Sequence, residues 1–147
     1  MDQTDISPSK LLSQFRQCSH LQRRTCHMQG QGRILRLLLE YGTLTQKQLA
    51  DITQRRSATL SEQLEMMESV GWITRVKNQA DKRNIDVALT DAGLAKAKEA
   101  EQERTRTANS LFSVLSVQEQ RQLSHILQKL YDSWQKNPLC RQEKEEP

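Results

Sequence analysis

Aromatic residues are scarce in this sequence, and glycine and proline are few. Only 4% of the 147 residues are Phe, Trp or Tyr, and 35% are hydrophobic in all. A chain of this length suits one compact domain, or one domain with helical arms. Because the apolar side-chain volume is small, we expect a helical protein that finishes burying its apolar surface against a partner subunit.

Long apolar runs are also absent. The longest apolar block is residues 37–39, within the segment 34–41, whereas a membrane-spanning helix requires about 20 residues. Residues 1–5 are polar and acidic, unlike the start of a signal peptide. The three cysteines are an odd number, which argues against a disulfide framework. We therefore predict a cytoplasmic protein with free thiols and no membrane partner.

Motifs that support catalysis are missing. The sequence has no glycine-rich phosphate loop and no nucleophile elbow, and its carboxylates form no pair in a cleft-forming context. His20, His27 and His125 stand without motif partners. We predict that the protein is not an enzyme and needs no cofactor.

Two of the cysteines fall in one predicted helix over residues 9–27. Cys18 and Cys26 would lie about 12 Å apart along its axis, too far for one ion with zinc–sulfur bonds of about 2.3 Å. We predict no metal site, and we favour Cys18 as a small apolar core residue and Cys26 as a surface thiol. A second hypothesis stays open, in which arginines nearby favour the thiolate of Cys18 and an oxidant attacks it.

The excess of positive charge lies in the first part of the chain. The formal net charge is +4, and residues 1–87 contain 13 Lys and Arg against 9 Asp and Glu. Residues 88–147 contain nine of each. This distribution indicates a polyanionic partner for the first part of the chain.

Apolar periodicity divides the chain into helices and strands. Spacings of three and four residues mark helices, and the period changes to two after Gly71. The predicted helices cover residues 9–27, 34–41, 46–52, 57–69, 91–107 and 116–134, and the predicted strands cover residues 72–77 and 85–89. Capping boxes are expected at Thr45 with Gln48 and at Ser116 with Glu119, and Ser57 is expected to cap the helix that follows it.

Two short helices, a polar turn and then a strand–turn–strand form the layout of a winged helix-turn-helix. The predicted fold class is therefore mainly α with a small two-stranded β wing (α+β). Within a single domain we expect an N-terminal dimerisation helix at 9–32, a DNA-binding lobe at 33–90, C-terminal dimerisation helices at 91–135 and a disordered tail at 136–147. The expected apolar anchors of a homodimer are Leu11, Phe15, Leu123, Ile126, Leu130 and Trp134.

Residues 57–69 form the expected recognition helix, which would enter a major groove. Its inward positions are Leu60, Leu64, Met66 and Met67. Its outward positions carry short or flexible hydrogen-bonding side chains that can read base edges, namely Ser57, Thr59, Ser61 and Gln63. Arg55 and Arg56, just before this helix, can hold a phosphate strand. Thr45 and Arg75 complete the expected DNA-facing set on these elements.

Residues 77–84 form the predicted wing, whose cations are Lys77, Lys82 and Arg83. An arginine on a projecting loop suits the narrow, electronegative minor groove of DNA. Asp81 lies two residues before Arg83, and we expect it to orient the guanidinium by a charge-assisted hydrogen bond.

Four short motifs occur here in order over residues 45–93. They are LA at 49–50, LEMMESVGWITR at 64–75, DKR at 81–83 and LTDAG at 89–93. In this combination the chain resembles the multiple antibiotic resistance regulator (MarR) family, and the likeness extends over residues 10–135. It implies a homodimer with interlocking terminal helices, wings that read minor grooves, and repression relieved by a small ligand or oxidant. The implied partners are a double-stranded, pseudo-palindromic DNA operator and a small-molecule effector.

Some residues in this region admit other interpretations. Glu62, Glu65 and Glu68 make the recognition helix acidic, as expected for a winged helix that binds protein instead of DNA. Arg55 and Arg56 can also be a solvated surface pair, and Asp81 can merely stabilise a turn. The sequence leaves open the operator, the effector, the regulated genes, and whether the protein represses or activates.

Overall fold

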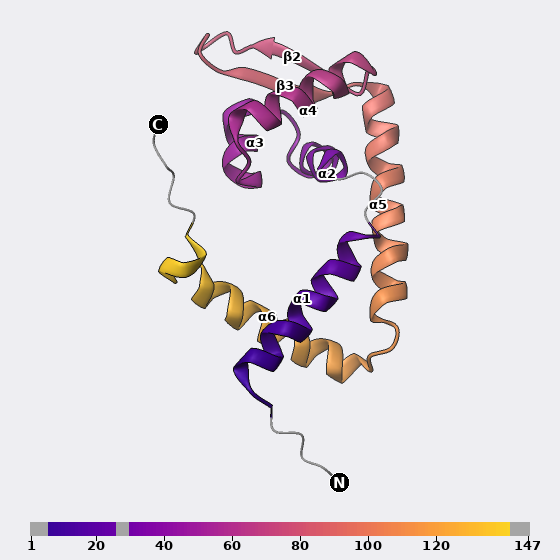
Figure 1. The fold of residues 1–147 in the computed structure, drawn as a ribbon. Coiled ribbons are helices and arrows are strands. Elements are labelled where there is room, and N and C mark those ends of the chain that lie inside the picture. Colours follow the sequence, from indigo (N-terminus) through magenta and orange to yellow (C-terminus); the bar gives the residue numbers. More distant parts are fainter. Residues whose placement is uncertain (1–5, 26–29, 142–147) are drawn as a thin grey trace. The chain divides into compact units, whose positions relative to one another are not determined.

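The structure of the protein is a computed structural model, and it describes residues 6–25 and 30–141. The chain divides into two compact units, Met1–Thr105 and Arg106–Pro147, and each is considered by itself. In chain order the elements are α1 (Pro8–Arg23), α2 (Gln31–Tyr41), β1 (Leu44–Thr45), α3 (Gln46–Thr53), α4 (Ser57–Ser69), β2 (Ile73–Lys77), β3 (Ile85–Leu89), α5 (Asp91–Phe112), α6 (Val117–Trp134) and the 3-10 helix η1 (Pro138–Cys140) (Figure 1).

The fold class predicted from the sequence is confirmed, since the chain is mostly helical with one small antiparallel sheet. The sheet contains a third strand that was not predicted, and its order is β1-β3-β2. The added strand β1 has only two residues, Leu44 paired with Val87 and Thr45 paired with Asp86. A two-residue strand is too short to show an alternating pattern, so the sequence carried no signal for it.

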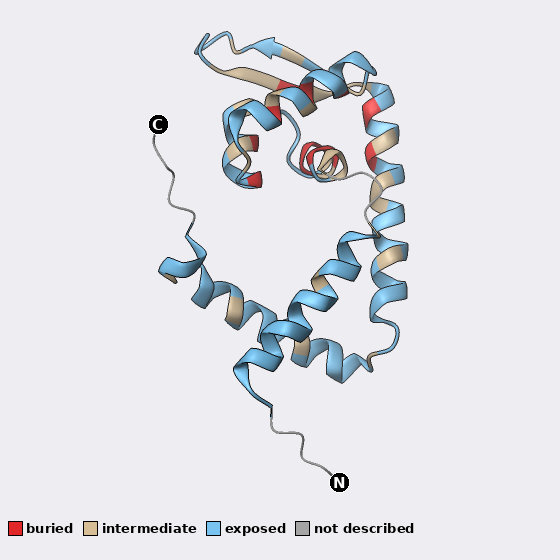
Figure 2. Cartoon of the chain, viewed as in Figure 1, coloured by how far each residue is buried: buried red, intermediate tan, exposed pale blue. Residues whose placement is uncertain are grey.

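The core of the first unit lies between α2, α3, α4 and the sheet, with the start of α5 against it. Its fully buried side chains are Ile34, Leu35, Leu49, Leu60, Leu64, Met67, Ile73 and Val87. Figure 2 shows buried positions on these elements and not on α1 or α6. The predicted inward positions Leu60, Leu64 and Met67 are confirmed. Met66 was wrongly placed among them, because its side chain is 37% exposed and accepts a contact from Gln31.

Three helix starts were predicted from capping chemistry, and two of them follow it. Both capping boxes are confirmed, Thr45 with Gln48 at α3 and Ser116 with Glu119 at α6. Ser57 was wrongly predicted as a cap, because Arg56 occupies the extended cap position and Ser57 is already helical. As a result, α4 begins without a side-chain hydrogen bond to its first amides.

The junction between α1 and α2 also differs from the prediction. The first helix ends at Arg23, and Arg24 and Thr25 form a turn. The rest of the predicted extension, including Cys26 and His27, lies outside the described residues. The second helix begins earlier than expected, at Gln31, because Gly30 adopts a φ of 84° and occupies the position before it. A positive φ of this kind favours glycine.

The predicted dimer anchors are accessible in the single chain. Leu11 is 53% exposed, Phe15 40%, Ile126 53% and Trp134 36%, while Leu123 and Leu130 are half-buried. Cys18 is exposed as well, so its predicted place in a core within the chain is wrong. Helix α1 contains no buried residue, so it contributes no core in which Cys18 could be buried. None of the helices in the described part of the chain is long and apolar enough to cross a membrane.

Candidate nucleic-acid interface

Helices α3 and α4 are joined by a short turn that follows the buried Thr53. Leu49 of α3 and Leu60 of α4 are fully buried in the common core. Thr53 ends α3, and its buried hydroxyl donates to the Leu49 carbonyl oxygen over 2.6 Å. Gln54 then turns the chain with a left-handed backbone, at φ 53° and ψ 34°. This turn fixes the direction in which α4 leaves the core.

The outward face of α4 presents small polar side chains near its start. Ser57 and Thr59 are exposed, and Ser61 and Gln63 are half-buried. Arg56 is exposed at the cap position, where its own side chain makes no capping bond. The first amides of a helix attract phosphate when no side chain caps them. This end of α4 therefore has the groups that a phosphate strand and base edges would meet.

Arg55 and Gln63, predicted as separate DNA contacts, form one unit in the structure. The Arg55 Nη1 donates to the Gln63 Oε1 over 2.6 Å. The guanidinium lies over Gly30, where a Cβ would overlap it. Gly30 thus has two roles: it occupies the position before the first residue of α2, and its lack of a side chain leaves space for the Arg55 guanidinium. The half-buried arginine is held by a neutral partner, so its charge is not cancelled by this bond.

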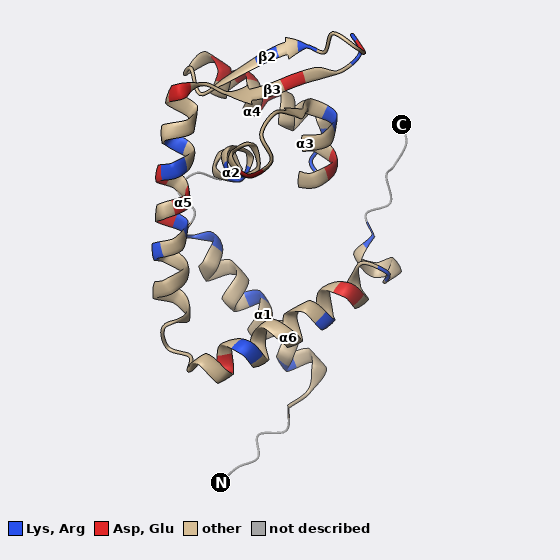
Figure 3. Ribbon diagram, turned by 180° about the vertical axis from the view of Figure 1, so that it is seen from behind, with Lys and Arg blue, Asp and Glu red and all other residues tan. Residues whose placement is uncertain are grey.

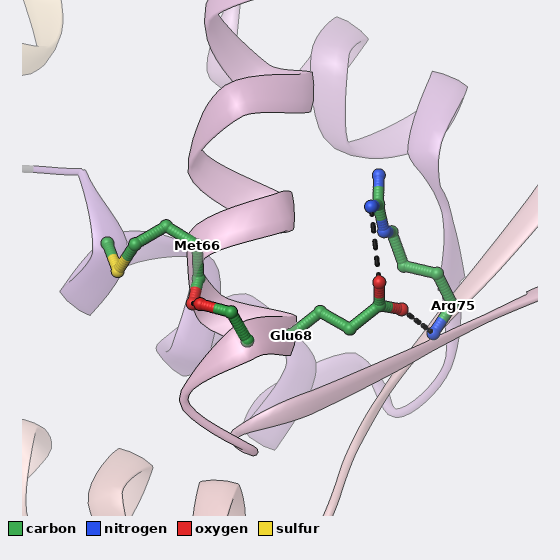
Figure 4. Close-up of polar contacts among 4 residues, drawn as sticks. Met66, Glu68 and Arg75 are labelled. Atoms are coloured by element: carbon green, nitrogen blue, oxygen red, sulfur yellow. Dashed lines mark hydrogen bonds and ion pairs between the residues drawn. The ribbon is translucent and has the colours of Figure 1, made fainter.

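The base of the wing is tied to α4 by an ion pair. The Glu68 carboxylate accepts from the Arg75 backbone amide over 3.1 Å and from its Nη2 over 3.2 Å (Figure 4). Because the side chain of Arg75 is only 20% exposed, it is engaged within the protein. Glu68 therefore anchors the first wing strand and does not belong to a free acidic face.

The wing itself is a short ordered loop between β2 and β3. Its cations Lys77, Lys82 and Arg83 are exposed, and Figure 3 shows Lys and Arg at this end of the sheet. Asp81 was predicted to orient the Arg83 guanidinium, but it does not. Its Oδ1 accepts from the Arg83 backbone amide instead, over 3.1 Å, because a two-residue spacing favours this turn bond.

The end of the sheet is joined to α5 by the LTDAG segment. The Thr90 hydroxyl donates to the Gly71 carbonyl oxygen and accepts from the Gly93 amide, and the Thr90 amide donates to the Trp72 carbonyl oxygen over 3.0 Å. Gly93 is buried against that same carbonyl, leaving no room for a Cβ. The Lys96 ammonium lies 5.6 Å from the Trp72 ring centroid. These bonds fix where the sheet ends and α5 begins.

A second group of cations lies on α2 and α5 within the first unit. Burial lowers the pKa of Arg36, the like charge of Arg104 lowers it further, and Glu101 opposes the change. An arginine remains charged at neutral pH despite such a shift. Arg33 donates to the Ile52 carbonyl oxygen over 3.2 Å and so joins α2 to the end of α3. This group supports the lobe and stands apart from the wing cations in sequence.

A metal site is not formed by the residues that the structure describes. Within 6–25 and 30–141, no three or more His, Cys, Asp or Glu side chains are placed to hold one ion. Cys26 and His27 lie outside this part of the chain.

Comparison with known proteins decides the family. Residues 29–85 match the model of the MarR family. The transcriptional regulator YwhA of Bacillus subtilis, whose own function is uncharacterized, is 30% identical over 100 residues, which are 67% of this chain and 71% of YwhA. The chain belongs to the MarR family.

Two further proteins are similar to this chain. The Bacillus subtilis transcriptional repressor MdtR is 29% identical over 66% of this chain and 63% of its own length. A crystal structure of S. aureus MepR in complex with DNA has a TM-score of 0.75 at 26% identity, over 88% of this chain and 99% of MepR. This MarR-family protein is thus a DNA-binding transcription regulator with a winged-helix fold, and it is not an enzyme.

The predicted site residues of this MarR-family chain fall into two groups. The side chains of the first group make no hydrogen bond or ion pair to another described side chain; Ser61 among them is half-buried, and the others are the exposed Arg56, Ser57, Thr59, Lys77, Lys82 and Arg83. Thr45, Arg55, Gln63, Arg75 and Asp81 are engaged in bonds within the protein. For both groups, a DNA contact remains a prediction.

Three residues of the site were missed from the sequence. Glu68 pairs with Arg75 seven positions away, a spacing for which no local rule exists. Gly30 faces Arg55 across the lobe. Asn78 begins the wing loop and makes several of its bonds. Only Asn78 carried a sequence signal, since asparagine favours turns in which its side chain bonds the backbone two residues on.

Proposed function

We propose that the protein is a homodimeric repressor that binds a pseudo-palindromic operator in the cytoplasm. In each subunit α4 enters a major groove, and the wing at residues 77–84 enters the adjacent minor groove. The observation that carries this proposal is the ordered wing that displays Lys77, Lys82 and Arg83 beside an uncapped α4. The name of the relative MdtR, a transcriptional repressor, supports repression over activation.

The proposed dimer uses the terminal helices. A stripe of apolar side chains on α6, together with Leu11 and Phe15 on α1, is accessible in one chain and would be covered by the second. The division into a helix at 9–32, a lobe at 33–90 and helices at 91–135 assigns dimerisation to the first and third segments. The tail proposed for 136–147 includes η1 at Pro138–Cys140.

Release from DNA is proposed to follow binding of a small ligand or oxidation. A ligand acts if it binds one spacing of the two lobes more tightly than the other. Cys18 is exposed on α1 and accessible to oxidant. If Cys18→Ser leaves oxidant-induced DNA release unchanged, the thiol has no part in it.

The test is fluorescence anisotropy with the DNA upstream of the protein's own gene, against a scrambled duplex, at two salt concentrations. Wild type should prefer the upstream duplex and weaken steeply with salt, because bound phosphates release counterions. Arg83→Ala should bind about tenfold more weakly, with a salt slope lower by about one. Equal binding to both duplexes, unchanged in Arg83→Ala, contradicts the proposal.

A second candidate function is favoured by the acidic side of α4. Glu62 and Glu65 are exposed, while Glu68 is engaged with Arg75. A winged helix of this charge would bind a basic protein surface. Three results together would establish this function. Wild type retains a protein partner, Glu62→Gln/Glu65→Gln loses it, and wild type binds both duplexes equally.

A further inference from the structure

One residue organises the backbone of the wing. The backbone N–H of Asn78 donates to the Asn84 carbonyl oxygen over 2.8 Å and closes the base of the loop. The Asn78 Oδ1 accepts from two backbone amides inside the loop, that of Ala80 over 2.8 Å and that of Asp81 over 3.0 Å. Asn78 is half-buried, although residues 79–83 around it are exposed. The backbone of Asn78 therefore bonds the far end of the turn, and its side chain bonds the amides inside it.

The orientation of the side-chain amide of Asn78 is set by Asp86. The Asn78 Nδ2 donates to both carboxylate oxygens of Asp86, over 3.1 and 3.2 Å. Because a carboxylate only accepts and a backbone N–H only donates, the amide has one satisfactory orientation. Asp86 lies in the central strand β3, opposite Thr45 of β1 and Val76 of β2. The loop is thus tied to the middle of the sheet.

A chain of bonds leads from this anchor to Arg83. The Asp81 amide is held by Asn78, and the Asp81 carboxylate in turn accepts from the Arg83 amide over 3.1 Å. The Asp81 carbonyl oxygen also accepts from the Asn84 amide over 3.0 Å. The position of the Arg83 backbone therefore depends on Asn78, because the four residues between them, 79–82, are exposed loop or turn.

We propose that Asn78 is the positioning residue of the wing, which holds Arg83 in place for the minor groove before DNA is bound. The inference rests on the proposed function, because it takes the DNA contact of Arg83 from there. Holding the loop in its bound form reduces the ordering cost of association. Asn78 raises affinity through Arg83, without a DNA contact of its own.

The choice of asparagine at this position has a charge argument. An aspartate could accept from the same two amides, but its carboxylate would face that of Asp86. It would also add negative charge beside Lys77 and Lys82, where phosphate is expected. A serine accepts more weakly in such turns. Asparagine supplies both the donor that Asp86 needs and the acceptor that the loop needs.

The test is a double-mutant cycle of Asn78→Ala and Arg83→Ala, read by anisotropy on the operator duplex. Asn78→Ala alone should weaken binding about fivefold, and it should change affinity less than about twofold in the Arg83→Ala background. Asn78→Ser should recover part of the loss. Asn78→Ala changes no charge, but it should still lower the salt slope, because Arg83 no longer reaches its phosphate-lined site. Thermal unfolding separates this effect from loss of the fold.

Gln79→Ala is the matched control, since Gln79 is exposed in the same loop and its side chain has no hydrogen bond to another described residue. Its effect should be the same in both backgrounds. Equal weakening by Asn78→Ala with and without Arg83 overturns the inference, as does wild-type binding by Asn78→Ala while Arg83→Ala is weak. Wild-type binding by Arg83→Ala would instead overturn the proposed minor-groove contact, and the role of Asn78 with it.

Discussion

At the scale of single residues, two glycines are required for different reasons. Gly30 combines a left-handed backbone with the space beneath the flexible end of Arg55. Gly93 has helical neighbours, and its constraint is the rigid Trp72 carbonyl that lies where a Cβ would be. A side chain can move away from a new methyl group, whereas a backbone carbonyl in a sheet end cannot do so without shifting the strand.

Gly93→Ala should therefore lower the free energy of unfolding by about 3 kcal/mol, because the start of α5 must separate from the end of the sheet. Chemical denaturation monitored by circular dichroism measures this. The control is Ala92→Ser in the same turn, where the exposed side chain should change stability by less than about 0.5 kcal/mol. Equal stability of the two variants would show that the turn adapts.

Gln63→Glu should weaken operator binding about fivefold or more at low salt. The new carboxylate would neutralise Arg55 across the 2.6 Å bond and add negative charge to the outward face of α4. Anisotropy on the operator duplex measures the change. Gln118→Glu adds the same charge at the exposed first turn of α6 and should bind as wild type does. Unchanged binding by Gln63→Glu would place Arg55 and Gln63 outside the DNA contact.

At the scale of elements, α3 and α6 begin in the same way and α4 differs. The first two have full capping boxes, with the hydroxyls of Thr45 and Ser116 accepting from the third amide of each helix. The recognition helix α4 has no such bond. Its first amides are thereby left for a phosphate, whereas those of α3 are satisfied within the protein.

Thr45→Ala should reduce stability by about 1 kcal/mol, because the Gln48 amide loses its 3.0 Å acceptor. Thr45→Ser retains the hydroxyl and should stay within a few tenths of wild type. Thermal unfolding compares the three proteins. A loss of DNA affinity in Thr45→Ala without a loss of stability would instead support the predicted DNA contact of Thr45.

At the scale of the whole molecule, α6 has an apolar stripe that the single chain leaves accessible. Leu123 and Leu130 are half-buried, while Ile126 and Leu127 are 53% and 40% exposed. At about 100° per residue these positions share one face of the helix. Surface of this kind is usual where a homodimer forms.

Ile126→Glu should convert the protein to a monomer and weaken operator binding by at least about tenfold, because two half-sites can no longer be held together. Sedimentation velocity measures the first effect and anisotropy the second. His125→Glu places the same residue on the polar face of α6, between Arg121 and Lys129, and should remain a dimer. A dimeric Ile126→Glu variant would place the interface elsewhere.

The sequence by itself determined the order of the elements apart from β1 and η1, the two capping boxes and the buried face of α4. These features depend on residues within one or two turns of each other, so spacing alone reports them. Its errors were also local: Met66 is apolar and adjacent to the buried face without belonging to it, and Ser57 has cap chemistry one position inside the helix.

The tertiary structure alone decided the contacts that shape the site. Gly30 meets Arg55, Glu68 meets Arg75, and Gly93 meets Trp72 only because the chain folds back on itself. The Asp81 bond to the Arg83 amide, in place of its guanidinium, was likewise a matter of loop geometry. A backbone amide and a guanidinium are both donors in reach of a carboxylate two residues away. Which of them it meets depends on the turn that Asn78 and Asp86 impose.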